Sequence, residues 1–242
     1  MARLARLSIA GLPHLIEQRG VQGTDLFRDD DDRSRFLSVL HQACKAGSLA
    51  LHGYVLLPNE FCLLVTPEEP WAVAHAMQGI GRRYVRHYND RHRRKGPLFE
   101  GRFRSAVLDP ERFMLPCLRY VESRVVPVSH GEGTEQVLWS SFRHHAGFGH
   151  DPMIEDGAVY WSLGNTPFER HGAWREFVSA GVPASERTRI ESALRGGWVI
   201  GGSDFAAQLH SAGRRRLMPG RPGRPPALRK PDLMSVPLRE KS

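Results

Sequence analysis

The sequence is poor in cysteine and lacks any long apolar run. Its 242 residues include three cysteines, Cys44, Cys62 and Cys117, and no two of them form a CxxC pair. A structural zinc site built from such pairs is therefore not expected, and an odd cysteine count without a secretory leader indicates a reducing cytosol. No window approaches the roughly 20 apolar residues that a transmembrane helix needs. We expect a soluble, cytoplasmic protein that does not enter a membrane.

The chain has an excess of positive charge. Its formal net charge is +8, and its isoelectric point is about 9.9. Such a balance favours a polyanionic partner, most simply nucleic acid, although a merely basic soluble protein has the same composition. Apolar residues make up 40% of the chain, so that a packed core can form.

Hydrophobic periodicity predicts alternating strands and helices in the first half of the chain. We expect strands at 13–18, 49–57, 61–66 and 98–108, and helices from the acidic run 29–32 to Gly47, at 71–90 and at 110–125. Pro58 and Asn59 form the turn of a hairpin between the two middle strands. The first six elements have the order of a ferredoxin-like sheet. The sequence thus predicts an α+β fold, with an antiparallel sheet and helices on one face.

The character of the chain changes after residue 131. We divide the sequence into a ferredoxin-like domain (1–131), an irregular continuation (132–169), a small helical extension (170–213) and a basic tail (214–242). Short helices are expected near 170–180, 184–195 and 204–210. The stretch from Arg214 to Pro231 holds seven basic residues and no acid. This composition is typical of a segment that is disordered in isolation.

Six segments share a pattern that the periodicity does not explain. They are 11–20 (GLPH through QRG), 54–66 (YVLLPN leading into LLVT), 81–86 (GRRYVR), 96–105 (GPLFEGRFRS), 119–122 (RYVE) and 139–142 (WSSF). Together and in this order, they resemble the insertion-sequence transposases that use a single tyrosine, including those associated with repetitive extragenic palindromes. The resemblance covers roughly residues 3–165, and the segment beyond it looks like the C-terminal extension of some members.

The resemblance implies a ferredoxin-like domain that cuts and rejoins single-stranded DNA, often next to a hairpin. In this family a tyrosine on a late helix attacks the phosphodiester, and Tyr120 has that position here. A His-x-His pair on a strand and an amide four residues after the tyrosine hold Mg²⁺ or Mn²⁺. Residues i and i+2 of a strand share one face, as do residues i and i+4 of a helix, so these groups can meet at one ion. The ion polarises the scissile phosphate.

The sequence departs from the family at all three expected metal positions. Glu60 and Cys62 replace the two histidines, and Arg124 replaces the amide. Glu60 can bind Mg²⁺ through oxygen, whereas a Cys62 thiol suits Zn²⁺ better and a fixed cation repels a metal ion. We expect Mg²⁺ and Mn²⁺ to bind poorly and strand cleavage to be impaired. The alternatives are a repurposed site, direct binding of phosphate by Arg124, and a packing role for Tyr120.

Basic residues that suit DNA binding are retained. The residues expected to contact nucleic acid in the domain are Arg82, Arg83, Arg86, Arg102 and Arg104. The aromatic residues expected to stack on bases between them are Tyr84, Tyr88 and Phe103. A solvated helix face with core aromatics produces the same pattern.

Two further features leave alternatives open. Arg221 and Arg224 lie in a Gly-Arg-Pro segment that resembles an AT-hook, which binds the DNA minor groove, although a nonspecific basic tail has the same composition. His144, His145 and His150 are close together in the irregular segment and are either metal ligands or solvated loop residues.

These features together predict a DNA-binding protein with impaired catalysis whose partner is single-stranded or hairpin DNA. An active transposase or nickase with an unusual metal site and a basic RNA-binding protein are the alternatives. A homodimer is an open option.

Overall fold

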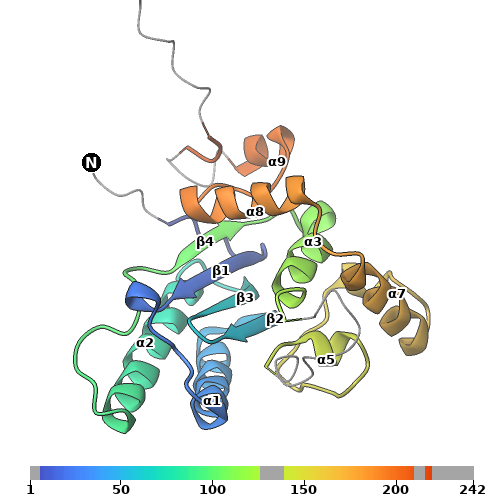
Figure 1. Ribbon diagram of the computed structural model, residues 1–242. Helices are drawn as coiled ribbons and strands as arrows, with labels where there is room; N and C mark the ends of the chain where they lie inside the picture. Colours follow the sequence, from blue (N-terminus) through green and yellow to red (C-terminus); the bar gives the residue numbers. More distant parts are fainter. Residues whose placement is uncertain (1–5, 126–138, 210–215, 220–242) are drawn as a thin grey trace, which may run out of the picture.

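A four-stranded antiparallel sheet forms the centre of the fold (Figure 1), which the computed structural model describes for residues 6–125, 139–209 and 216–219. The strands are β1 (His14–Arg19), β2 (Leu49–Leu57), β3 (Glu60–Pro67) and β4 (Arg104–Val107). Their order is β2-β3-β1-β4, and every neighbouring pair is antiparallel. This is the ferredoxin-like arrangement, and the predicted α+β fold is confirmed.

The last strand is shorter than the sequence predicts. An alternating strand is expected over 98–108, but only Arg104–Val107 pair with β1. Gly96 and Gly101 have φ values of +91° and +60°, a left-handed conformation that interrupts an extended chain. The segment before β4 instead reaches β1 by single contacts, such as the hydrogen bond from the amide of Glu100 to the carbonyl of Arg19.

Two helices cover one face of the sheet. They are α1 (Asp30–Gly47) and α2 (Ala72–Arg91). The side chain of Asp29 accepts a hydrogen bond from the amide of Asp32, so the acidic run caps α1 as its position predicts. Side chains of the strands alternate between the two faces, apart from a register shift in β2 between Leu51 and Gly53. Ile16, Phe61 and Leu63 belong to the core beneath α1 and α2.

The opposite face is covered as well. The neighbouring strand residues Leu15, Cys62 and Leu64 form a second core with α3 (Pro110–Glu122), α7 (Pro167–Ser179) and α8 (Ala184–Gly196). Gly53 allows α3 to lie close to β2, because a Cβ atom there would be 2.3 Å from Leu118 Cδ1. The helices of the second half therefore share a core with the sheet.

Shorter elements complete the description. They are the 3-10 turn η1 (Val21–Gly23) and the helices α5 (Phe142–His145), α6 (Ala158–Trp161) and α9 (Ser203–Gln208). The helices α7, α8 and α9 lie where the sequence predicts three short helices. None of the described helices is long and apolar enough to cross a membrane. The predicted boundary at residue 131 and nearly all of the predicted tail, with Arg221 and Arg224, lie outside the described residues.

Candidate active site

The three positions at which the sequence departs from the family lie in contact. Glu60 and Cys62 point to the same side of β3, and Arg124 follows the end of α3 on that side. One terminal nitrogen of Arg124 donates to Cys62 Sγ at 2.8 Å, and the other forms an ion pair with Glu60 Oε1. The guanidinium group thus bridges the two side chains that stand at the histidine positions.

Residues of β1 extend this arrangement. Arg19 Nε lies 3.0 Å from Glu60 Oε2 and 3.0 Å from Glu17 Oε1. Glu17 stands opposite Cys62 in the pairing of β1 with β3. We call Glu17, Arg19, Glu60, Cys62 and Arg124 the Arg124 cluster. Both oxygens of the Glu60 carboxylate are therefore already paired with arginines.

Tyr120 lies beside the Arg124 cluster and is nearly inaccessible. Its side chain is 3% exposed, and the guanidinium carbon of Arg124 is 5.7 Å from its ring centroid. Burial, with smaller effects from Cys62 and Glu17, raises the pKa of the Tyr120 hydroxyl well above its usual value. Ile190 and Leu194 of α8 belong to the same core. The Tyr120 hydroxyl is thus protonated at neutral pH, and its side chain is nearly covered.

Burial also keeps the thiol of Cys62 protonated. Cys62 is fully buried, and this burial raises the pKa of its thiol well above the usual range. Burial lowers the pKa of Arg124 from its usual value of 12.5, opposed mainly by the charge of Glu17. At neutral pH the cluster therefore contains a neutral thiol that accepts a hydrogen bond from the arginine.

A basic cavity opens next to the Arg124 cluster. It has a volume of about 450 Å³ and shares Glu17 and Arg19 with the cluster. The arginines that line it are Arg6, Arg19, Arg102, Arg104 and Arg195. Two of the five arginines of the domain that are predicted to bind nucleic acid, Arg102 and Arg104, thus lie together at this cavity. Arg104 also pairs with Glu17 Oε1 at 3.1 Å, whereas Arg102 is exposed.

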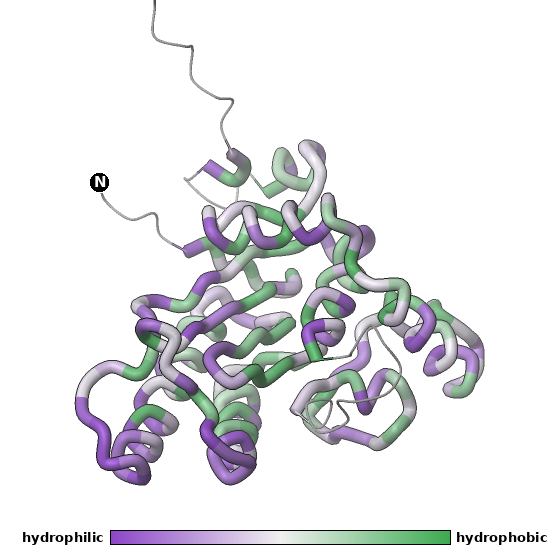
Figure 2. The backbone as a smooth tube through the Cα atoms, in the orientation of Figure 1, coloured by the Kyte–Doolittle hydropathy of each residue, from purple (hydrophilic) through white to green (hydrophobic). Residues whose placement is uncertain are grey.

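The other three predicted arginines lie on α2. Arg82, Arg83 and Arg86 are exposed, and their contacts are with polar side chains, such as the 3.8 Å pair of Arg86 with Asp90. Figure 2 shows that the end of α2 and the loop after it form a hydrophilic stretch. These three arginines are not among the residues that line the cavity at β1 and β4.

The prediction that aromatic residues of α2 stack on bases is wrong. Tyr84 and Tyr88 are both fully buried. Their hydroxyl groups donate to the carbonyls of Leu26 and Asp25. The alternative is correct for these two aromatic residues, which belong to the core. Phe103 is half-buried, with the Arg6 guanidinium carbon 3.7 Å from its ring centroid.

A second polar cluster lies at the other side of α3. Glu122 Oε1 accepts hydrogen bonds from Ser141 Oγ at 2.5 Å and His145 Nδ1 at 2.6 Å, and Oε2 accepts from Trp174 Nε1 at 2.7 Å. His145 Nε2 lies 3.4 Å from Asp156 Oδ1. We call Glu122, Ser141, His145, Asp156 and Trp174 the Glu122 cluster. It ties α3 to α5 and α7.

Sequence reasoning singled out His145 but missed its partners. Glu122 and Ser141 stand within the RYVE and WSSF segments, which was the only signal they carried. His145 is 1% exposed, so it is not a solvated loop residue. Burial lowers the pKa of His145, but the carboxylates of Glu122 and Asp156 outweigh this effect and raise it to about 9.

Comparisons with known proteins identify a similar fold. No protein-family model matches the chain, and no curated protein matches it. A solved structure of a REP-associated tyrosine transposase bound to a REP hairpin is similar over 66% of this chain and 93% of that chain, with a TM-score of 0.50 and 16% identity. A candidate transposase from Deinococcus radiodurans matches 51% of this chain and 98% of its own length, with a TM-score of 0.35 and 17% identity. The chain shares the fold of the REP-associated transposase.

Proposed function

We propose that this chain is a DNA-binding protein of the single-tyrosine transposase family in which strand cleavage is impaired. The observation that carries the proposal is the position of Arg124, whose guanidinium group bridges Glu60 and Cys62. The six ordered sequence segments and the shared fold support the family, and the net charge of +8 supports a nucleic-acid partner.

The residues at the family's metal positions do not fit Mg²⁺ or Mn²⁺. Mg²⁺ requires oxygen ligands in near-octahedral geometry. Here the donors are a neutral buried thiol and a carboxylate that two arginines already neutralise, and a cation lies between them. Binding an ion would require Arg124 to leave a partly buried ion pair. A metal ion at this site is therefore not part of the proposed function.

Tyr120 is poorly placed to act as a nucleophile. An enzymatic tyrosine needs activation, by a nearby base, a metal or a lowered pKa. The pKa of Tyr120 is instead raised by burial, and the residue belongs to a core shared with α8. With 3% of the residue exposed, a DNA phosphate has little access to it.

Binding of DNA remains supported by the basic cavity and by the exposed arginines of α2. Arginine side chains that contact phosphates release counterions, and this release produces affinity without any catalytic metal. The cavity is where Arg102 and Arg104 meet three further arginines. Single-stranded or hairpin DNA is the proposed partner because the sequence resemblance implies it.

A second candidate function is a nickase that works without a metal at Tyr120. The observation that favours it is the distance of 5.7 Å between the Arg124 guanidinium carbon and the Tyr120 ring. An arginine beside the nucleophile can neutralise a phosphoryl oxygen. This function requires Arg124 to exchange Glu60 for the phosphate.

One assay separates these functions. Fluorescently labelled hairpin-bearing single-stranded DNA is incubated with the full chain, with Mg²⁺, with Mn²⁺ or with chelator. Anisotropy measures binding, and a denaturing gel of the same samples measures covalent adduct. We expect binding that weakens steeply with salt and no adduct. An adduct in chelator supports the metal-free nickase, a metal-dependent adduct contradicts impaired catalysis, and stronger binding of an RNA of equal sequence contradicts a DNA-specific role.

A further inference from the structure

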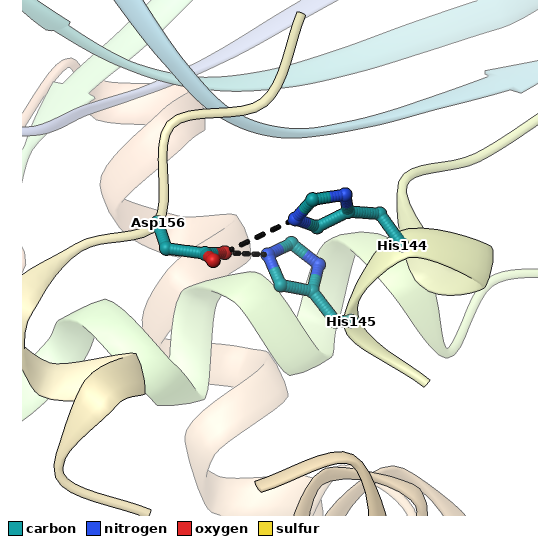
Figure 3. A group of neighbouring side chains, drawn as sticks. All are labelled: His144, His145 and Asp156. Carbon is teal, nitrogen blue, oxygen red and sulfur yellow. Dashed lines mark ion pairs between the residues drawn. The ribbon is translucent and has the colours of Figure 1, made fainter. Parts of the chain in front are cut away.

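A group of side chains in the second half of the chain has the geometry of a metal site. His144 and His145 come from α5, and Asp156 comes from the segment before α6 (Figure 3). His144 Nε2 and His145 Nε2 lie 3.3 Å and 3.4 Å from Asp156 Oδ1. The three candidate ligand atoms all lie within 4.8 Å of one another. We propose that His144, His145 and Asp156 bind one divalent transition-metal ion of the Zn²⁺ class.

The distances between these atoms suit ligands of a shared ion better than direct hydrogen bonds. A charge-assisted hydrogen bond between nitrogen and a carboxylate oxygen is about 2.7–2.9 Å long. Two ligands of a tetrahedral ion, each with a bond of about 2.1 Å, lie about 3.4 Å apart. Asp156 Oδ1 is also buried and accepts no hydrogen bond among the described residues. An ion between the three atoms would satisfy this oxygen.

The Glu122 cluster supplies the support that a metal-binding histidine requires. His145 Nδ1 donates its proton to Glu122 at 2.6 Å, so that Nε2 is turned toward Asp156. A carboxylate that holds the remote nitrogen of a histidine is a recurrent feature of zinc sites, because it fixes the ring and raises its basicity. Glu122 is itself fixed by Ser141 and Trp174. The orientation of His145 is thus set before any ion arrives.

The chemistry of the site favours a zinc-like ion with an open position. Two imidazoles and one carboxylate suit Zn²⁺ or Co²⁺, whereas Mg²⁺ and Ca²⁺ prefer oxygen ligands. A cavity of about 700 Å³ borders His144 and Asp156 and is also lined by His150 and His171. Three protein ligands and access to this cavity leave room for water or an anion as the fourth ligand.

Binding of the ion has one structural consequence. The amide of Asp151 donates to His144 Nδ1 at 3.1 Å, so in the ion-free chain the proton of a neutral His144 is on Nε2. A neutral imidazole bound through Nε2 carries its proton on Nδ1 instead. The hydrogen bond from Asp151 must therefore break, and the segment after α5 must shift. This shift is a second readout of binding that needs no variant.

The test uses the full chain stripped of metal with a chelator and then dialysed. Zn²⁺ is titrated in competition with a chromophoric chelator, and Co²⁺ is titrated while its visible absorption is recorded. We expect one ion per chain and the intense bands of four-coordinate Co²⁺. NMR should show the Asp151 amide among the signals that move when Zn²⁺ is added.

Two variants locate the ion. His144→Gln and Asp156→Asn keep the size and polarity of the side chains and should weaken Zn²⁺ binding by at least about tenfold. His87→Gln, on the distant helix α2, is the matched control and should bind as the wild type does. Circular dichroism checks that each variant is folded. If both variants unfold, X-ray absorption of the Zn²⁺-bound wild type should still report two histidine ligands.

Three results overturn the proposal. They are an absence of stoichiometric binding to the wild type, unchanged affinity in both folded variants, or a Zn²⁺ spectrum without histidine ligands. If the wild type binds no ion, His145 instead contacts both carboxylates, Glu122 and Asp156, with both ring nitrogens protonated. The test uses no DNA, so its outcome is independent of the proposed DNA-binding function.

Discussion

The two polar clusters on either side of α3 both contain carboxylates, but they differ in the groups that pair with those carboxylates. In the Arg124 cluster a guanidinium group lies between the two residues that replace the family's histidines, and Arg19 pairs with the remaining carboxylate oxygen. In the Glu122 cluster, His145 and its neighbour His144 converge on an Asp156 oxygen that lacks a hydrogen bond among the described residues. The capacity to bind an ion thus depends on whether the donor atoms are already paired as well as on residue type.

The two clusters also differ in their importance for the fold. The carboxylate of Glu122 is fully buried and joins three helices, α3, α5 and α7, by side-chain hydrogen bonds. The Arg124 cluster lies at one end of the two central strands, β1 and β3, with Arg19 46% exposed. We expect the Glu122 cluster to determine stability and the Arg124 cluster to determine catalytic competence.

The largest expected effect is on stability. Glu122→Ala removes the acceptor of three buried donors and leaves His145 with one carboxylate partner. The free energy of unfolding should fall by about 3–5 kcal/mol, the cost of breaking a buried charged network. Urea denaturation measures it. Glu111→Ala, at an exposed position of the same helix, is the control and should change stability by less than about 1 kcal/mol. Equal effects of the two substitutions would show that the Glu122 cluster does not determine stability.

The next expected effect concerns His14, a buried residue outside both clusters whose pKa is changed mainly by burial. His14 is fully buried, and burial lowers its pKa from 6.5 to about 4, opposed by a hydrogen bond to Leu12. Its Nε2 accepts the amide proton of Ile9, so the neutral form is required. The stabilisation is complete above pH 6.5 and is lost as the pH falls toward 4. It amounts to about 3 kcal/mol.

Unfolding free energies measured from pH 7 to pH 4 in wild type and in His14→Gln check this expectation. The difference between the two proteins should shrink as the pH falls. A difference that is constant with pH would show that His14 does not change its protonation on folding.

A smaller effect is expected on DNA binding. Replacing Arg102 and Arg104 with alanine removes two candidate phosphate contacts from the basic cavity. The slope of log K against log salt for single-stranded DNA should become shallower by about 1.4, or about 0.7 for each contact. The control replaces Arg35 and Lys45, two exposed residues of α1, and changes the net charge equally. A change of equal size in this control would indicate a general charge effect.

Much of the fold follows from local sequence patterns. The hairpin of β2 and β3 follows from two β-rich segments on either side of Pro58 and Asn59, and the start of α1 follows from an acidic run that complements the helix dipole. Patterns of this kind act over a few residues. They therefore fix where an element begins or ends, as they do here for β2 and α1.

The candidate sites depend on contacts that no local pattern contains. Helical spacing places Tyr84 and Tyr88 among arginines, but it does not reveal that their side chains point toward the core while the arginines point outward. The bridge from Arg124 to Cys62 joins residues that are 62 positions apart. The contact between Glu122 and Trp174 spans 52 positions. Such pairings depend on how helices are packed on the sheet, so they became visible only in the structure.

The most direct test of the account restores the family's ligands in the Arg124 cluster. Glu60→His, Cys62→His and Arg124→Asn are combined, because residues 60 and 62 share one face of β3 and Arg124, four positions after Tyr120 and just beyond the end of α3, contacts both of them. The assay is covalent adduct formation with labelled hairpin-bearing single-stranded DNA and Mn²⁺ or Mg²⁺. We expect no adduct with the wild type, a metal-dependent adduct with the triple variant, and none when Tyr120→Phe is added. Adduct formation by the wild type at a level equal to that of the triple variant would contradict the account.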